Sequence, residues 1–177
     1  VSAPIQAAVS DLDRVVNRGY ITGEELRAIS ARRSVTKGEF TAFVLRASEA
    51  EEDVSGTDAA FVPESIYKNS VLSAMSKGIV DKNLMQNGKF DCDGNITREE
   101  AAAILVNALK YRGIIPEKQD SSVFADAGQI KAWAIPYVEK ALGAKICLGD
   151  NNTMFRPSDA VSLQEAAALL IRFAGLL

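Results

Sequence analysis

Acidic side chains are the main candidates for chemistry in this chain of 177 residues, which contains 23 aspartates and glutamates and no histidine. The lack of histidine excludes Ser-His-Asp and Cys-His catalysis within the chain, together with the commonest zinc ligand. Two carboxylates across a cleft can hydrolyse a glycoside, and Glu100 with Asp126 could form such a pair. Their spacing does not favour them over any other pair, so we predict no catalytic residues and no enzyme.

One acidic segment is similar to the calcium-binding loop of an EF-hand. Between Lys89 and Glu100 it has aspartate at the third and fifth positions, glycine at the sixth and glutamate at the twelfth. Lysine at the first position cannot supply the carboxylate that this loop needs there. A calcium-dependent module is therefore an alternative interpretation, and we predict no metal site and no cofactor.

The final glutamate of that segment belongs to a five-residue pattern that the chain contains three times. The pattern is a branched apolar residue, Thr or Ser, two free positions and Glu, and it occupies residues 35–39, 96–100 and 161–165. Thr or Ser followed three positions later by Glu is the capping box of a helix N-terminus. Helix capping is therefore the expected structural role of the three glutamates, Glu39, Glu100 and Glu165.

An apolar helical run follows each copy of the pattern, at residues 40–48, 101–110 and 166–174. Helices that are apolar on most sides must be central. Each repeat also has a partner helix upstream, and these are expected at residues 5–18, 64–77 and 129–142, ended by Gly19, Gly78 and Gly143. We predict an all-α fold in which three helical repeats have a pseudo-threefold arrangement around a central three-helix bundle.

The repeats divide the chain into residues 1–54, 55–115 and 116–177, which together should form one compact module. A net charge of −3 without a Lys/Arg-rich stripe argues against nucleic acid. No apolar run is long enough to insert in a membrane. Because Val1 is not methionine, we expect a mature or excised segment. The two cysteines, Cys92 and Cys147, could be bonded or free.

The third repeat resembles a surface-layer homology (SLH) repeat. The resemblance rests on Phe124-Ala-Asp126, Trp133-Ala-Ile135, Phe155-Arg-Pro157 and the pattern that ends at Glu165. The second repeat keeps Phe90 and the best copy of the pattern, Thr97-Arg98-Glu99-Glu100. The first is divergent and keeps mainly Thr36-Lys37-Gly38-Glu39. The chain is thus identified as three tandem SLH repeats.

This resemblance implies a non-catalytic module that anchors a bacterial surface protein outside the cell, at the cell wall or S-layer. Its partner would be an anionic secondary cell-wall polysaccharide, commonly pyruvylated, that binds in grooves between repeats. A module that binds modified peptidoglycan or another protein is the alternative. The full-length chain could carry an S-layer or enzyme domain as well.

In the family, a groove is lined by the basic residue of the pattern in one repeat and by Asp and Trp of another. Matching positions imply one groove made by Thr97, Arg98, Asp126 and Trp133. There a guanidinium could bind a carboxylate through two parallel hydrogen bonds. They imply a second, poorer groove made by Thr36, Lys37 and Tyr67. The third copy has Leu163 in place of the basic residue, which implies a weakened groove there.

Overall fold

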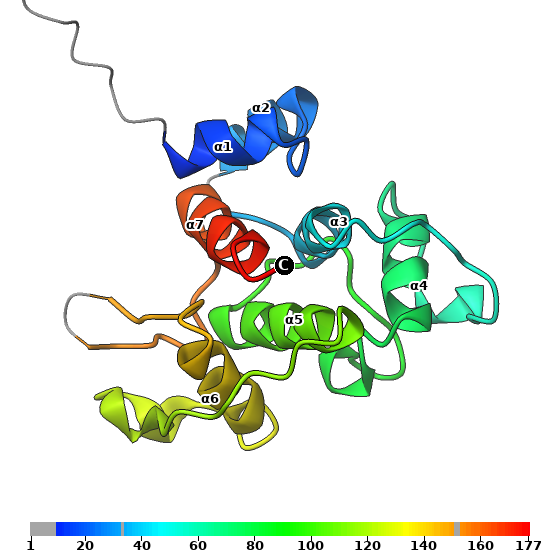
Figure 1. Ribbon diagram of the computed structural model, residues 1–177. Helices are drawn as coiled ribbons and strands as arrows, with labels where there is room; N and C mark the ends of the chain where they lie inside the picture. The colour runs from blue at the N-terminus through cyan, green and yellow to red at the C-terminus, as the bar shows by residue number, and fades with distance from the viewer. Residues whose placement is uncertain (1–9, 33, 151–152) are drawn as a thin grey trace, which may run out of the picture.

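The computed structural model describes residues 10–32, 34–150 and 153–177. These residues form seven α-helices, four short 3-10 helices and no sheet (Figure 1), so the prediction of an all-α fold is confirmed. The α-helices are α1 (Asp11–Asn17), α2 (Gly23–Arg32), α3 (Lys37–Ala47), α4 (Lys68–Ser76), α5 (Arg98–Tyr111), α6 (Ile135–Gly143) and α7 (Leu163–Ala174). The 3-10 helices are η1 (Ala59–Phe61), η2 (Lys82–Leu84), η3 (Ser121–Val123) and η4 (Ala127–Gln129).

The helices α3, α5 and α7 each begin at a capping box. In α3, the Thr36 hydroxyl accepts from the Glu39 amide at 3.2 Å, and the Glu39 carboxylate accepts from the Thr36 amide at 2.8 Å. The same two contacts join Thr97 with Glu100 in α5, and Ser162 with Glu165 in α7. Each box satisfies backbone donors that a helix start leaves unpaired, which stabilises the helix by about 1 kcal/mol.

The branched residues that precede the three caps are joined by a closed ring of backbone hydrogen bonds. Val35 donates to Val161 at 3.0 Å, Val161 donates to Ile96 at 2.9 Å, and Ile96 donates to Val35 at 3.0 Å. All three side chains are fully buried. The ring therefore holds the starts of α3, α5 and α7 together, although they lie far apart in the sequence.

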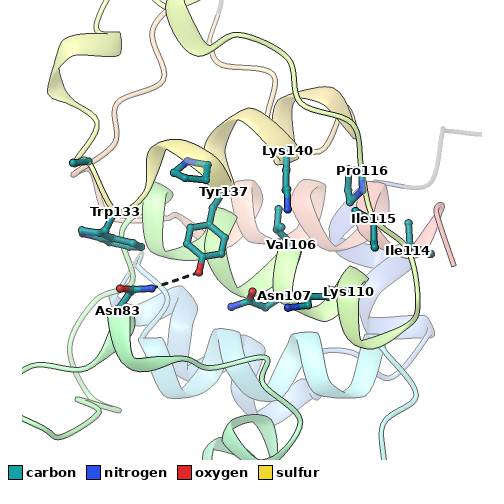
Figure 2. A pocket seen from close by; sticks show the side chains of 12 residues that line it. Asn83, Val106, Asn107, Lys110, Ile114, Ile115, Pro116, Trp133, Tyr137 and Lys140 are labelled. Carbon is teal, nitrogen blue, oxygen red and sulfur yellow. Dashed lines mark hydrogen bonds between the residues drawn. The ribbon is translucent and has the colours of Figure 1, made fainter.

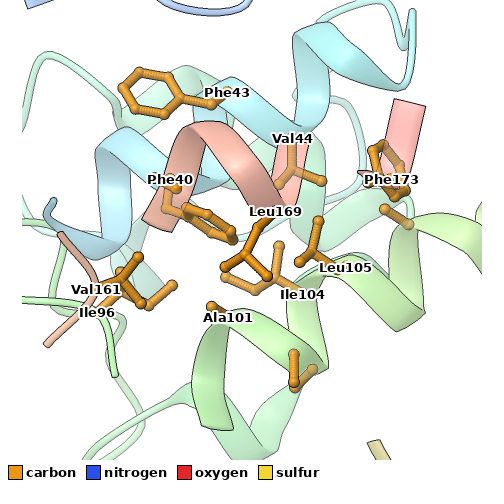
Figure 3. Close-up of a cluster of buried hydrophobic side chains, with 14 of the residues drawn as sticks. Phe40, Phe43, Val44, Ile96, Ala101, Ile104, Leu105, Val161, Leu169 and Phe173 are labelled. Atoms are coloured by element: carbon orange, nitrogen blue, oxygen red, sulfur yellow. The ribbon is translucent and has the colours of Figure 1, made fainter. Parts of the chain in front are cut away.

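Apolar side chains of the three capped helices meet beside this ring and form the core, as Figure 3 shows. The core includes Phe40, Val44, Ala101, Ile104, Leu105, Leu169 and Phe173. Small alanines at the start of α5 are completely buried, which lets the neighbouring helices approach closely. The runs predicted as central helices therefore do lie at the centre of the fold.

The outer helices pack in an order that the sequence did not suggest. The helix α4 packs on α3, α6 packs on α5, and α1 packs on α7 (Figure 1). An upstream helix therefore lies mainly against the central helix of the preceding repeat, and α1 closes the circle by packing on the last helix. We expected each upstream helix to partner the central helix of its own repeat. The observed order makes every repeat depend on its neighbours for burial.

The upstream helices are shorter than predicted. Helix α6 begins at Ile135 instead of residue 129, because Pro136 is tolerated only in a first turn. Helix α4 begins at Lys68. The helix expected from Ile5 begins at Asp11, and Ile5 itself lies outside the described residues. None of the described helices is long and apolar enough to cross a membrane.

Two of the three predicted glycine stops are present. Gly19 and Gly78 follow α1 and α4 with φ of 72° and 68°, the left-handed conformation that ends a helix. Gly143, in contrast, is the last residue of α6, and Lys145 takes the positive φ. Gly143 is needed for close approach, because a β-carbon there would lie 2.0 Å from the carbonyl oxygen of Glu117.

Replacing Gly143 with alanine should lower the free energy of unfolding by about 2 kcal/mol, since the backbone near Glu117 must move. Urea denaturation would measure this. Gly23→Ala is the control, because a β-carbon there would meet only the end of Arg27 at 3.9 Å, and it should change stability by less than about 0.5 kcal/mol. Equal stability of the two variants would contradict the role given to Gly143.

Candidate functional site

A groove between the second and third repeats combines an aromatic wall with unpaired positive charge. It has a volume of about 490 Å³ and lies between α5, α6 and the linker that joins them. We call it the Trp133 groove, and Figure 2 shows Trp133 at one end and the apolar linker residues at the other. Its polar lining consists of Asn83, Asn107, Lys110, Tyr137 and Lys140.

Lys110 and Lys140 give the Trp133 groove its charge. They come from α5 and α6, on opposite sides of the groove (Figure 2). Neither lysine side chain has an ion-pair or hydrogen-bond partner among the residues that the structure describes. The lining contains no carboxylate. An anion that enters the groove therefore meets two ammonium groups that form no ion pair among the described residues.

Asp81 fixes the polar side chains of this groove. Its carboxylate accepts from the Tyr137 hydroxyl at 2.7 Å, from the Asn107 amide at 3.0 Å and from the Asn83 backbone at 2.8 Å. Burial, followed by the hydrogen bond and charge of Asp81, raises the pKa of Tyr137. Tyr137 also meets Trp133 edge to face, with ring centroids 6.3 Å apart. The aromatic wall is thus held in place before a ligand binds.

The corresponding groove between the first and second repeats contains Tyr67. We call it the Tyr67 groove; it has a volume of about 520 Å³ and lies between α2, α3 and the start of α4. Arg46 forms a bidentate ion pair with Glu25, with contacts of 2.9 and 2.7 Å, and Arg32 pairs with Glu39. Burial, followed by the charges of Glu25 and Glu39, raises the pKa of Tyr67.

Arg98 does not line the Trp133 groove. Its guanidinium donates to the Phe155 carbonyl at 2.6 Å and to Glu165 at 2.8 Å, and lies 5.5 Å from the centre of the Phe155 ring. The side chain is only 11% exposed. Arg98 borders a smaller cavity of about 220 Å³ with Cys147. The structure therefore separates Arg98 from Trp133, which the family resemblance put in one groove.

Lys37 makes a contact equivalent to that of Arg98. It joins the starts of α3 and α5, as Arg98 joins the starts of α5 and α7. We call each such contact between the starts of two central helices a joint. The Lys37 ammonium contacts Glu100 at 2.7 Å, and its side chain is 6% exposed. The basic residue of one pattern thus pairs with the capping glutamate of the next. Leu163 is buried at the third joint, where Glu39 pairs with Arg32 instead. These pairs join adjacent repeats, so they hold the fold together.

The contacts of Glu165 predict how the stability of the chain depends on pH. Burial raises its pKa, but hydrogen bonds from Ser162 and the charges of Arg98 and Arg156 outweigh burial, so the pKa is below its usual value of 4.5. A lowered carboxylate pKa adds stability above the unfolded-state pKa, and that stability is lost as the pH falls through the folded-state pKa. Urea unfolding from about pH 6 to pH 3 should show a shallower loss of stability in Glu165→Gln than in the parent. Identical slopes would contradict the lowered pKa.

Asp126 lies inside the third repeat and is 4% exposed. Its carboxylate accepts from the backbone amides of Phe155 and Arg156, both at 2.7 Å. This contact holds Arg156 in a left-handed conformation with φ of 56°. Thr97 and Thr36 use their hydroxyls as helix caps. Of the seven residues predicted to bind ligand, only Trp133 and Tyr67 line these two grooves. Arg98 and Lys37 form ion pairs between the starts of the central helices, Thr97 and Thr36 cap helices, and Asp126 holds a turn.

The acidic segment that is similar to an EF-hand loop is a turn in this structure. One oxygen of Asp91 accepts from the backbone amides of Asp93 and Gly94 at 3.3 and 3.1 Å. Within the described ranges, no three His, Cys, Asp or Glu side chains come together as a possible metal site. The two cysteines are buried free thiols, and burial raises the pKa of Cys147 to about 11.

Sequence reasoning missed the lysines and amides of the Trp133 groove. A signal for them exists, because Trp133, Tyr137 and Lys140 follow the i, i+4, i+7 spacing of one helix face. Asn107 and Lys110 share a face of α5 in the same way. Helix α2 was also missed, although Thr22 and Glu25 form the capping box that marked the three central helices.

Comparison with known proteins identifies the class of the C-terminal part of this chain. Residues 123–167 match the family model of the S-layer homology domain. The chain therefore contains one S-layer homology domain, and the matched range includes Asp126, Trp133 and Phe155.

Proteins similar to this chain include surface proteins and large enzymes. The surface-layer 125 kDa protein of Lysinibacillus sphaericus is 27% identical over 97% of this chain and 14% of its own length. An amylopullulanase of Thermoanaerobacterium thermosulfurigenes is 28% identical over 90% of this chain and 8% of its own length. An endoglucanase of Bacillus sp. (strain KSM-635) is 30% identical over 85% of this chain and 16% of its own length. The chain thus spans a small part of each relative.

Proposed function

We propose that this chain is a non-catalytic module that anchors a bacterial surface protein to the cell wall. Its ligand is an anionic secondary cell-wall polysaccharide, pyruvylated as the family resemblance implies, and the Trp133 groove is the main binding site. The observation that carries this proposal is the pair of unpaired lysines beside an aromatic wall, at a junction of two repeats. The S-layer homology domain at residues 123–167 supports the anchoring role.

The chemistry of the Trp133 groove suits an acidic sugar. The indole of Trp133 offers a flat apolar surface to a pyranose ring, and it meets Tyr137 edge to face. Lys110 and Lys140 attract a carboxylate as point charges, so they accept it in several orientations. Asn83 and Asn107 add amide groups for hydroxyls of the sugar.

We also propose that residues 1–54, 55–115 and 116–177 are three S-layer homology repeats with pseudo-threefold symmetry. The closed ring of hydrogen bonds between Val35, Ile96 and Val161 supports this proposal. So does the cyclic packing of α1, α4 and α6. The module would act at the cell surface or in an S-layer, and the protein that it anchors could be an S-layer protein or a glycosidase, as among the relatives.

Sedimentation with purified cell walls tests this function, before and after acid removes the secondary polysaccharide. We expect the chain to sediment with intact walls and to remain in solution with stripped walls. Equal retention on both would overturn the polysaccharide proposal and favour peptidoglycan as the ligand. No retention on either would overturn the anchoring role.

A further inference from the structure

We infer that the Tyr67 groove is a second carbohydrate site with the opposite charge preference, which binds an amino sugar with a free amine. The Tyr67 groove is built from the same parts as the Trp133 groove: a central helix, the connector before it and the upstream helix of the next repeat. The size is similar too, about 520 against 490 Å³. The two grooves differ in the charges that line them.

The arginines of the Tyr67 groove are already occupied. Arg46 lies seven residues after its capping glutamate, as Asn107 does in the other groove, but its guanidinium is bound by Glu25 and the Tyr20 carbonyl. Arg32 is bound by Glu39. An incoming anion would have to break one of these ion pairs and would leave a largely buried carboxylate without its partner.

The carboxylates of Glu24 and Asp93 remain uncompensated in the same groove. Both line it, both are exposed, and neither has an ion pair among the described residues. They come from α2 in the first repeat and from the connector of the second, so the two repeats each supply one. With the arginines neutralised by Glu25 and Glu39, the lining has a net charge of −2, whereas two lysines give the Trp133 groove a net charge of +2.

Apolar surface lies beside these carboxylates. Ala74 in α4 and Ala141 in α6 accept equivalent hydrogen bonds from the turn after each helix. Ile66 precedes Ala74 by the same number of positions as Trp133 precedes Ala141, so Ile66 is the equivalent of Trp133. Tyr67 is the next residue after Ile66. Ile66 is 90% exposed in the groove, next to the half-buried ring of Tyr67. A branched side chain and an aromatic ring can cover the apolar face of a sugar, as Trp133 does in the other groove.

A ligand with a primary ammonium group on a sugar ring matches both the uncompensated carboxylates and the apolar surface beside them. The ammonium would be bound by Glu24 and Asp93 through charge-assisted hydrogen bonds. An N-acetylated sugar lacks this charge, and an acidic sugar would be repelled. The module would therefore hold two chemically different segments of wall glycan, one in each groove.

Isothermal titration calorimetry with a glucosamine tetramer, fully deacetylated, tests this inference. We expect the parent chain to bind it, and Glu24→Gln with Asp93→Asn to bind at least about tenfold more weakly. The N-acetylated tetramer should bind weakly to both. The charge-matched control is Glu51→Gln with Glu117→Gln, two carboxylates outside the groove, and it should bind like the parent.

Three results would overturn the inference: no binding of the deacetylated tetramer, equal binding of the acetylated one, or equal weakening in the control. Lys110→Ala with Lys140→Ala separates this inference from the anchoring proposal, because it alters only the Trp133 groove. That variant should keep its affinity for the tetramer. If it lost this affinity as well, the two ligands would share one groove and the second site would be excluded.

Discussion

Replacing Lys110 and Lys140 together with alanine is expected to weaken binding to acidic wall polysaccharide by roughly 100-fold. A hydrogen bond to a charged group contributes about 1.5 kcal/mol at the low end, so two of them account for about 3 kcal/mol. Neither lysine side chain has a partner in the free protein among the described residues, so the variant should keep its thermal stability. Sedimentation with intact walls at increasing protein concentration would measure the affinity.

The control for this double variant removes the same charge elsewhere. Lys77 and Lys89 lie outside the Trp133 groove, so Lys77→Ala with Lys89→Ala should bind walls nearly as well as the parent. Equal weakening in both double variants would mean that net charge, and not the groove, governs binding. Affinity should also fall with added salt in the parent more steeply than in Lys110→Ala with Lys140→Ala.

Replacing Arg98 with alanine is expected to lower the free energy of unfolding by about 2 kcal/mol, because it removes a charged donor from a part-buried ion pair. The Phe155 carbonyl and Glu165 would each lose a charged donor at the joint of the second and third repeats. Urea unfolding would measure the loss. Arg27→Ala, on the exposed face of α2, should change stability by less than about 0.5 kcal/mol.

The family resemblance led us to expect the opposite result for Arg98. As a groove residue, it would be needed for wall binding and dispensable for stability. Intact stability with strongly weakened wall binding would therefore contradict its role in the joint and return Arg98 to the candidate ligand residues. Measuring both properties on the same variant distinguishes the two roles.

The central helices were predictable because their signals are local. A capping box depends on residues three positions apart, and the apolar runs that follow Glu39, Glu100 and Glu165 can only be buried. The helix pairing was not predictable in the same way. Nothing near α4 in the sequence indicates that it packs on α3 in the preceding repeat, since that choice depends on the closed ring at Val35, Ile96 and Val161.

Only part of the candidate site was predictable, because the roles of its other residues depend on contacts between distant segments. Trp133 was found because its type and position match a family pattern, and it does line a groove. The lysines were missed because their role depends on forming no ion pair in the folded chain, which a sequence does not reveal. Arg98 shows the converse: its type suits an anion, but the fold places Glu165 and Phe155 within its reach.

Fluorescence of Trp133, the chain's only tryptophan, tests the central claim most directly, because this residue forms the wall of the proposed site. The experiment titrates the chain with purified acidic wall polysaccharide fragments and follows the emission of Trp133. We predict a saturable change in the emission, and no such change in Lys110→Ala with Lys140→Ala. Fragments that bind, as shown by calorimetry, without altering the emission of Trp133 would contradict the assignment of the Trp133 groove.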